Sequence, residues 1–154
     1  MIATRQEITK IAQNLHDADR KIVFTNGCFD IIHRGHIEYL NKAKKLGDIL
    51  IIGLNSDDSV RRLKGINRPI NYEQDRAVVL DNLKSVDYVC LFDEDTPYEL
   101  IKIVQPDILV KGGDWSVQDI VGSDIVLALG GEVKSLHFIE GKSTSDIIEK
   151  IKNS

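Results

Sequence analysis

Short apolar runs alternate along the chain with stretches whose apolar residues recur at helical spacing. Four of these runs predict strands, namely Ile22–Phe24, Ile49–Leu54, Tyr88–Phe92 and Ile108–Val110, and the more polar stretch Glu132–Leu136 after two glycines predicts a fifth. Near-continuous apolar runs are typical of parallel strands that are buried on both faces. The alternation of strand and helix therefore predicts an α/β fold with a doubly wound, five-stranded parallel sheet. We expect one domain over residues 1–154, with an N-terminal helix over 1–20 and a core over 21–152.

Capping residues and apolar spacing mark the helices between these strands. Thr4 and Glu7 form a T-x-x-E capping box before an amphipathic first helix. The series Thr96–Glu99 combines an N-cap, a proline at the first helical position and the N3 glutamate, so it predicts another helix start. Residues 120–129 are also expected to be helical. The last helix should place Ile147, Ile148 and Ile151 on its inner face.

Composition limits the function classes that fit this fold. The chain has 154 residues, a formal net charge of −4 and a pI near 5.5, and no run of Lys and Arg gives it a basic nucleic-acid-binding surface. No apolar run approaches the ~20 residues of a membrane span, and the first residues lack a signal-peptide core. The two cysteines, Cys28 and Cys90, are too few for a disulfide framework. We therefore expect a cytoplasmic protein with neither nucleic acid nor membrane as partner.

The stretch Lys21–His36 carries the most informative candidate chemistry, because it predicts a strand, a tight glycine turn and the start of a helix. Gly27 permits a sharp turn, while His33 and His36 lie three apart on one face of a helix that Gly35 helps to begin. A helix N-terminus offers backbone N–H groups and a partial positive charge, so two imidazoles beside it predict a phosphate site. A metal-binding pair and two surface residues are the alternatives, although no further His or Cys lies at zinc-finger spacing.

Polar turns follow other strands at the sheet edge where open α/β folds bind their ligands. Asn55 and Asp57 follow the second strand, and Lys111–Trp115 follows the fourth with two glycines that suit a close ligand or a plain reversal. Ser143–Ser145 suit phosphate or serve only as a helix cap. Arg61–Pro69 holds four cations, a glycine and a proline, which predicts a mobile loop over the site or an ordinary solvated loop. Several of these turns should converge on one pocket.

Taken together, these turns resemble the HxGH nucleotidyltransferase superfamily over about Lys21 to Lys152. The motifs concerned are Gly27-Cys28-Phe29-Asp30 with His33-x-Gly35-His36, Lys111-Gly112-Gly113-Asp114-Trp115 and Gly141-Lys142-Ser143-Thr144-Ser145. Within the superfamily the chain looks most like the adenylyltransferases that make ADP-heptose, a lipopolysaccharide precursor. The sequence motifs that favour this branch are Arg68–Asn71, Phe92–Pro97 and Pro106–Asp114. Many relatives in the branch carry a fused sugar-kinase domain, so the resemblance implies a separate protein for the kinase step here.

Two alternatives stand beside this reading. The glycerol-3-phosphate cytidylyltransferase family shares the histidine motif, but it has Arg-Thr where this chain has Phe138–Ile139, and the missing arginine favours the heptose branch. The heptose family usually ends Cys-Ser-Thr-Thr, whereas this chain has Lys142–Ser145. The second alternative is a nucleotide-binding module without turnover, which would not need both histidines together with Lys64 and Arg76.

The resemblance implies a Rossmann-like nucleotidyltransferase fold and direct attack of a sugar 1-phosphate on the α-phosphorus of ATP, with Mg²⁺ bridging the phosphates rather than held in a protein cage. It also implies a possible homodimer. The residues expected to be catalytic are His33, His36, Lys64 and Arg76. Those expected to contact the nucleotide are Asn26, Gly27, Cys28, Phe29, Asp30, Gly35, Lys111, Gly112, Gly113, Asp114, Ser143, Thr144 and Ser145. Those expected to contact the sugar phosphate are Asn55, Asp57 and Trp115.

Overall fold

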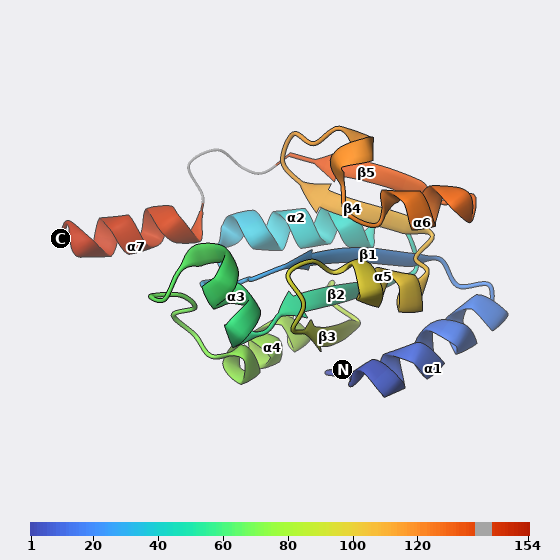
Figure 1. Ribbon diagram of the computed structural model, residues 1–154, viewed down its shortest axis with the longest axis horizontal. Coiled ribbons are helices and arrows are strands. Elements are labelled where there is room, and N and C mark those ends of the chain that lie inside the picture. The colour runs from blue at the N-terminus through green and yellow to red at the C-terminus, as the bar shows by residue number, and fades with distance from the viewer. Residues whose placement is uncertain (138–142) are drawn as a thin grey trace.

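The computed structural model describes residues 1–137 and 143–154, and its centre is one sheet of five parallel strands in the order β3-β2-β1-β4-β5 (Figure 1). The strands are β1 (Ile22–Gly27), β2 (Ile49–Asn55), β3 (Tyr88–Phe92), β4 (Ile108–Gly112) and β5 (Glu132–Leu136). All five predicted strands are confirmed within a few residues. The order runs outward from β1 in both directions, so the predicted doubly wound α/β fold is also confirmed.

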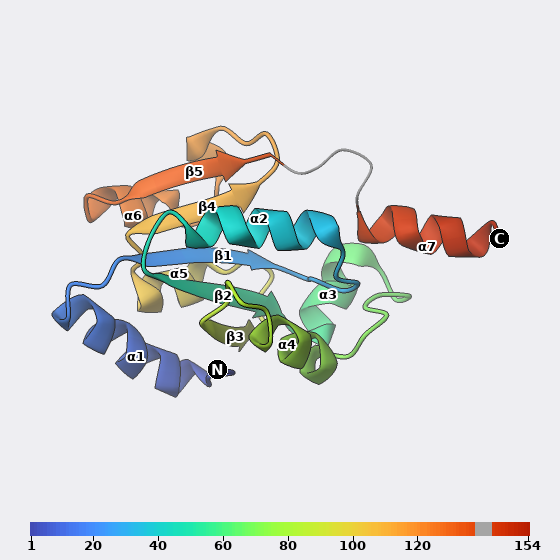
Figure 2. The same cartoon turned by 180° about the vertical axis from the view of Figure 1, so that it is seen from behind.

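Helices cover both faces of the sheet, as the two opposite views in Figures 1 and 2 show. The helices are α1 (Arg5–Asp17), α2 (Arg34–Lys44), α3 (Asp57–Lys64), α4 (Glu73–Asp81), α5 (Tyr98–Val104), the short 3-10 helix η1 (Val117–Asp119), α6 (Ser123–Ala128) and α7 (Thr144–Lys152). One apolar cluster joins Phe24 of β1 to α1, α5 and α6, and a second joins the adjacent Val23 to α2 and α4. Successive strand residues face opposite layers, which explains why the central strands are largely apolar. The edge strand β5 is polar at three positions and has no buried residue.

The first helix begins as its capping box predicts. The Thr4 hydroxyl accepts a hydrogen bond from the Glu7 N–H at 3.1 Å, and the Glu7 carboxylate accepts one from the Thr4 N–H at 3.0 Å. Ile8 and Ala12 on this helix are buried in the cluster that contains Phe24. The helix therefore packs on the sheet.

The predicted loop over Arg61–Pro69 is wrong in its first part, because α3 continues to Lys64. The Ser56 hydroxyl caps this helix by accepting a hydrogen bond from the Ser59 N–H at 3.1 Å. Acidic residues occupy its first turn and basic residues its last, an arrangement that complements the helix dipole. The cations that suggested a solvated loop thus stabilise a helix end, and the helix stops only at Gly65, where φ is 101°.

Two other helix predictions need correction at their starts. Residues 120–129 are helical only from Ser123 to Ala128, because Gly122 adopts a φ of 89° that interrupts any earlier start. The helix after β3 begins at Tyr98, so Pro97 is its N-cap residue rather than its first helical residue.

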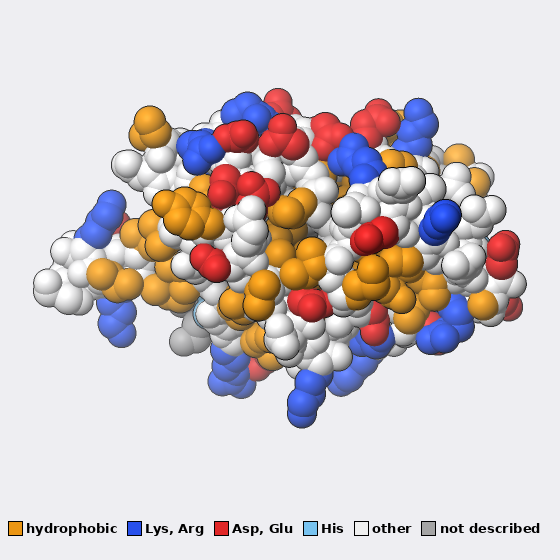
Figure 3. Space-filling model, turned by 90° about the horizontal axis from the view of Figure 1, so that it is seen from below, with side chains coloured by type: hydrophobic (Ala, Val, Ile, Leu, Met, Phe, Trp, Pro, Cys, Tyr) orange, Lys and Arg blue, Asp and Glu red, His pale blue; other side chains and the backbone are white. Residues whose placement is uncertain are grey.

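The last helix, α7, extends away from the sheet (Figures 1 and 2). Its Ser143 cap is confirmed, since the hydroxyl accepts a hydrogen bond from the Asp146 N–H at 3.0 Å. The predicted inner apolar face is wrong for Ile151, which is 65% exposed, and Figure 3 shows hydrophobic side chains open to solvent at that end. Ile147 and Ile148 are half-buried, and no residue of α7 is fully buried. Among the described helices, none combines the length and apolarity that crossing a membrane would demand.

Candidate active site

A cavity of about 600 Å³ opens beyond the carboxyl ends of β1, β2 and β4, beside the switch point between β1 and β4. Fifteen of the predicted site residues line it: Asn26, Gly27, Cys28, Phe29, Asp30, His33, His36, Asn55, Lys64, Lys111, Gly112, Trp115, Ser143, Thr144 and Ser145. The structure therefore brings the polar turns together in one pocket.

The two histidines are fixed by the first turn of α2. His33 is the N-cap residue, and its Nδ1 accepts a hydrogen bond from the Gly35 N–H at 3.0 Å. The Nδ1 of His36 accepts one from the His33 N–H at 3.3 Å, and the two ring centroids lie 4.0 Å apart. A neutral imidazole has one N–H, so an accepting Nδ1 places the proton on Nε2. His36 therefore offers an Nε2–H donor at the cavity wall.

Burial keeps the His36 ring neutral. Loss of solvation lowers its pKa to about 4, and the positive charges of His33 and Lys64 act in the same direction. A neutral ring at pH 7 agrees with the tautomer deduced above.

This low pKa predicts a pH-dependent loss of stability. Between pH 6.5 and 4 the unfolded chain binds a proton on His36 that the folded protein does not, so the free energy of unfolding falls as pH falls. Because the ring is partly exposed, we expect this contribution to be about 1 kcal/mol between pH 7.5 and 5. His36→Gln should shrink the pH-dependent drop by that amount in urea unfolding, and an unchanged drop would contradict the assignment.

Gly27 has a steric role in the site. The Phe29 ring packs over Gly27, and its centroid lies 5.4 Å from that of the His36 ring. The Phe29 backbone adopts a φ of 46° to place the ring there. A Cβ added at Gly27 would stand 2.9 Å from Phe29 Cε2. The glycine is therefore needed so that Phe29 can pack beside His36.

Three cations reach the cavity wall from different elements. Lys111 lies near the end of β4 with its Nζ 5.6 Å from the centre of the Trp115 ring, and burial lowers the pKa of its amine. Lys64 ends α3, and Arg68 donates a hydrogen bond to the Ser145 hydroxyl at 3.2 Å. Within residues 1–137 and 143–154, no carboxylate forms an ion pair with Lys64, Arg68 or Lys111. This convergence of positive charge suits a polyanion.

Five predicted residues do not line the cavity: Gly35, Asp57, Arg76, Gly113 and Asp114. Gly35 lies inside the first turn of α2. Gly113 forms the turn after β4 with a φ of 103°, and the exposed Asp114 carboxylate lies 3.1 Å from His137 Nδ1.

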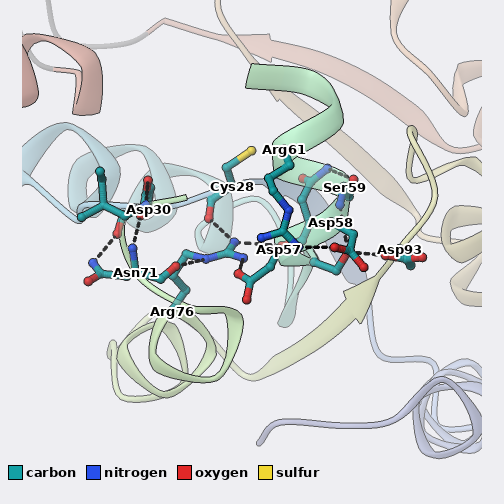
Figure 4. Close-up of polar contacts among 12 residues, drawn as sticks. Cys28, Asp30, Asp57, Asp58, Ser59, Arg61, Asn71, Arg76 and Asp93 are labelled. Atoms are coloured by element: carbon teal, nitrogen blue, oxygen red, sulfur yellow. Dashed lines mark hydrogen bonds and ion pairs between the residues drawn. The ribbon is translucent and has the colours of Figure 1, made fainter. Parts of the chain in front are cut away.

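Arg76 differs most from its predicted role as a cation on the triphosphate. It is 1% exposed, and its Nη1 donates to the carbonyl oxygens of Cys28 and Asn55 at 2.8 Å each (Figure 4). Its Nη2 donates to the Asp57 carboxylate at 2.9 Å and its Nε to the Asn71 carbonyl at 3.0 Å. The guanidinium thus joins protein segments behind the cavity.

Sequence reasoning missed nine residues of the wall: Tyr39, Leu63, Arg68, Asp95, Thr96, Pro97, Asp119, Ile120 and Val121. Asp95–Pro97 follow the carboxyl end of β3, so the rule applied to the other strand ends could have found them. Asp119–Val121 come from the 3-10 segment, for which no signal was available. The predicted Gly141 and Lys142, with the neighbouring Phe138–Glu140, lie outside the described residues.

The donors at this site do not form a metal cage. In the part of the chain that the structure describes, no three His, Cys, Asp or Glu side chains cluster closely enough to hold a metal ion. The Asp95 carboxylate at the cavity wall is already paired with Arg62 at 2.7 Å.

The sequence is similar to a known protein family and to curated proteins. The family described as cytidylyltransferase-like matches residues 24–150. Bifunctional protein HldE of Wolinella succinogenes is 59% identical over 153 residues, which are 99% of this chain and 31% of that protein. The chain thus spans about a third of the length of such curated relatives.

Two solved structures are also similar. The lipopolysaccharide core biosynthesis protein of Thermoplasma volcanium is 32% identical, with a TM-score of 0.62 over 80% of this chain and 99% of that one. Pantoate-beta-alanine ligase of Francisella tularensis has a TM-score of 0.66 over 99% of this chain and 77% of that one. The ligase is only 17% identical, so it supports the fold alone.

Proposed function

We propose a function from one premise: the chain belongs to the cytidylyltransferase-like family. It transfers a nucleotidyl group from a nucleoside triphosphate to a phosphorylated acceptor. The observation that carries this proposal is the histidine pair on the first turn of α2, with the His36 Nε2–H in a cavity where Lys64 and Lys111 have no carboxylate partner among the described residues.

For the substrates we propose ATP and D-glycero-D-manno-heptose 1-phosphate, with ADP-heptose and pyrophosphate as products. The motifs shared with ADP-heptose-forming adenylyltransferases support this choice. The names of two similar proteins, bifunctional protein HldE and a lipopolysaccharide core biosynthesis protein, also support it.

The proposed chemistry is one direct displacement. An oxygen of the sugar 1-phosphate forms a bond to the α-phosphorus of ATP while the bond to pyrophosphate breaks, and no covalent intermediate with the protein forms. Negative charge shifts among the phosphoryl oxygens, so catalysis depends on positioning and on donors that match this charge. His36 Nε2–H and Lys64 would stabilise the transferring group, while Arg68 and Lys111 would hold the remaining phosphates.

Mg²⁺ would neutralise phosphate charge when bound. The described side chains do not form a site for it, so we propose that phosphate oxygens and water hold it, and no step here depends on it. A cytoplasmic location and a homodimer stay predictions.

The test is pyrophosphate release from ATP or CTP with a panel of sugar and polyol phosphates. We expect turnover only with ATP and heptose 1-phosphate. A His36→Asn preparation made in parallel, as a control for contaminating enzymes, should show at most about a hundredth of the wild-type rate. Turnover with CTP and glycerol 3-phosphate would contradict the substrate assignment. Tight ATP binding without pyrophosphate release from any acceptor would instead indicate a nucleotide-binding module.

A further inference from the structure

We propose that Asp30, Asp57 and Arg76 are positioning residues. They hold the cation-bearing segment from α3 to α4 at a fixed distance from the histidine turn, which is the stretch of residues 28–36 from the end of β1 through the first turn of α2. This segment, residues 57–72, carries Lys64 and Arg68. The inference concerns the geometry of the protein itself, and only its functional consequence rests on the proposed function.

The first attachment is at the start of α3. Asp57 is the first residue of that helix, and its carboxylate accepts the Arg76 Nη2 hydrogen bond at 2.9 Å. The Arg76 side chain is 0% exposed and that of Asp57 is 15% exposed, so this ion pair is shielded from water. The same guanidinium donates to the carbonyl of Cys28, in the turn between β1 and the histidines. Arg76 therefore links the start of α3 directly to the histidine turn (Figure 4).

The second attachment is at the other end of the segment. The buried Asp30 carboxylate accepts hydrogen bonds from the N–H groups of Ile70 and Asn71 at 2.7 and 2.8 Å. The Asn71 side chain donates in return to the Asp30 carbonyl at 2.7 Å. Figure 4 shows Asn71 lying between Asp30 and Arg76, so the two attachments meet. The Asp30 carboxylate thus uses both oxygens on this segment while the residue forms part of the cavity wall.

Within this segment α3 also packs through its buried residues Ser59 and Val60, and its Arg62 pairs with Asp95. From Lys64 to Asn67 the chain is exposed. Ile66 is 87% exposed, and a Cβ at Gly65 would meet no atom within 4 Å. The two attachments therefore add to the packing of α3 in placing Lys64, and they add to the hydrogen bond with Ser145 in placing Arg68. Loss of either end should let this segment move away from the histidines while the sheet stays folded.

Limited trypsin digestion tests this placement without any assay of turnover. Asp30→Asn and Asp57→Asn should each speed cleavage after Lys64 by about tenfold, relative to cleavage after Lys45 at the end of α2, because each variant loses a charge-assisted hydrogen bond. Asp58→Asn is the matched control, since it makes the same change one residue away, in an exposed pair with Arg61 (Figure 4). Asn71→Ala, at an exposed position, gives a milder variant if the buried changes prevent folding. Cleavage ratios equal to wild type in the folded variants would overturn the inference.

ATP binding separates positioning from general stability. Measured by calorimetry on variants whose circular dichroism shows a folded protein, the ATP dissociation constant should rise about tenfold for Asp57→Asn and stay unchanged for Asp58→Asn. In a Lys64→Ala background the Asp57→Asn effect should largely disappear, because both changes remove the same contact. If the two changes instead raise the ATP dissociation constant by fully additive amounts, Asp57 does not act through Lys64, and the inference is overturned. Failure of wild type to bind ATP would contradict the proposed function and leave the digestion result to decide the positioning role.

Discussion

His36→Asn is expected to lower kcat by about 10²-fold or more, whereas His36→Gln should retain a substantial part of the rate. The two amides test different nitrogens of the imidazole. The Asn side-chain oxygen can replace Nδ1 as acceptor for the His33 N–H, but it leaves nothing at the position of Nε2. The longer Gln places an N–H close to that position. A donor acting on the transferring phosphoryl group therefore favours Gln over Asn.

Steady-state pyrophosphate release measures this difference, with thermal unfolding to confirm that both variants are folded. Glu38→Gln, which removes a surface pair with Arg34 on the same helix, serves as the matched control and should match wild type. Equal rates for His36→Asn and His36→Gln would remove the Nε2 donor from the proposed mechanism.

The sheet was predictable because the central strands β1, β2 and β4 are largely buried on both faces and so leave apolar runs that few other elements produce. The edge strand β5 is only partly buried and leaves a weaker pattern. Helix ends were less predictable where charged residues have two uses. The cations at the end of α3 match a solvated loop as well as a helix C-terminus, and only the Ser56 cap distinguishes these. In α7 the apolar spacing correctly predicted a helix, but spacing alone does not say which surface covers it.

The site was predictable as a set of strand ends, but the roles of individual charges were not. Arg68 lines the cavity and Arg76 is buried behind it, although both follow β2 within a short distance in the sequence. What separates them is the set of carbonyls and the carboxylate that surround Arg76, which come from four places along the chain. Asp30 shows the same limit, because its carboxylate partners are backbone N–H groups 40 and 41 residues away.

Lys64→Gln is expected to lower kcat/KM by about 10²-fold, because it removes a positive charge near the transferring phosphoryl group while keeping most of the side-chain length. Lys64 lies close enough to the histidines that its charge helps to lower the pKa of His36. Removing it should therefore also raise that pKa toward its ordinary value, which is a change that NMR titration of the ring can follow.

Lys64→Arg and Lys45→Gln complete this experiment. Lys64→Arg keeps the charge and should recover part of the activity and hold the His36 pKa low, whereas Lys45→Gln changes an exposed lysine at the end of α2 and should leave both quantities unchanged. If the His36 pKa rises in Lys64→Gln while kcat/KM stays at the wild-type value, Lys64 lies beside the histidine without acting on the substrate. If neither quantity changes, Lys64 does not stand near His36 in solution, and the cation would have to come from Arg68 or Lys111. The paired measurement therefore separates the position of the charge from its use in the reaction.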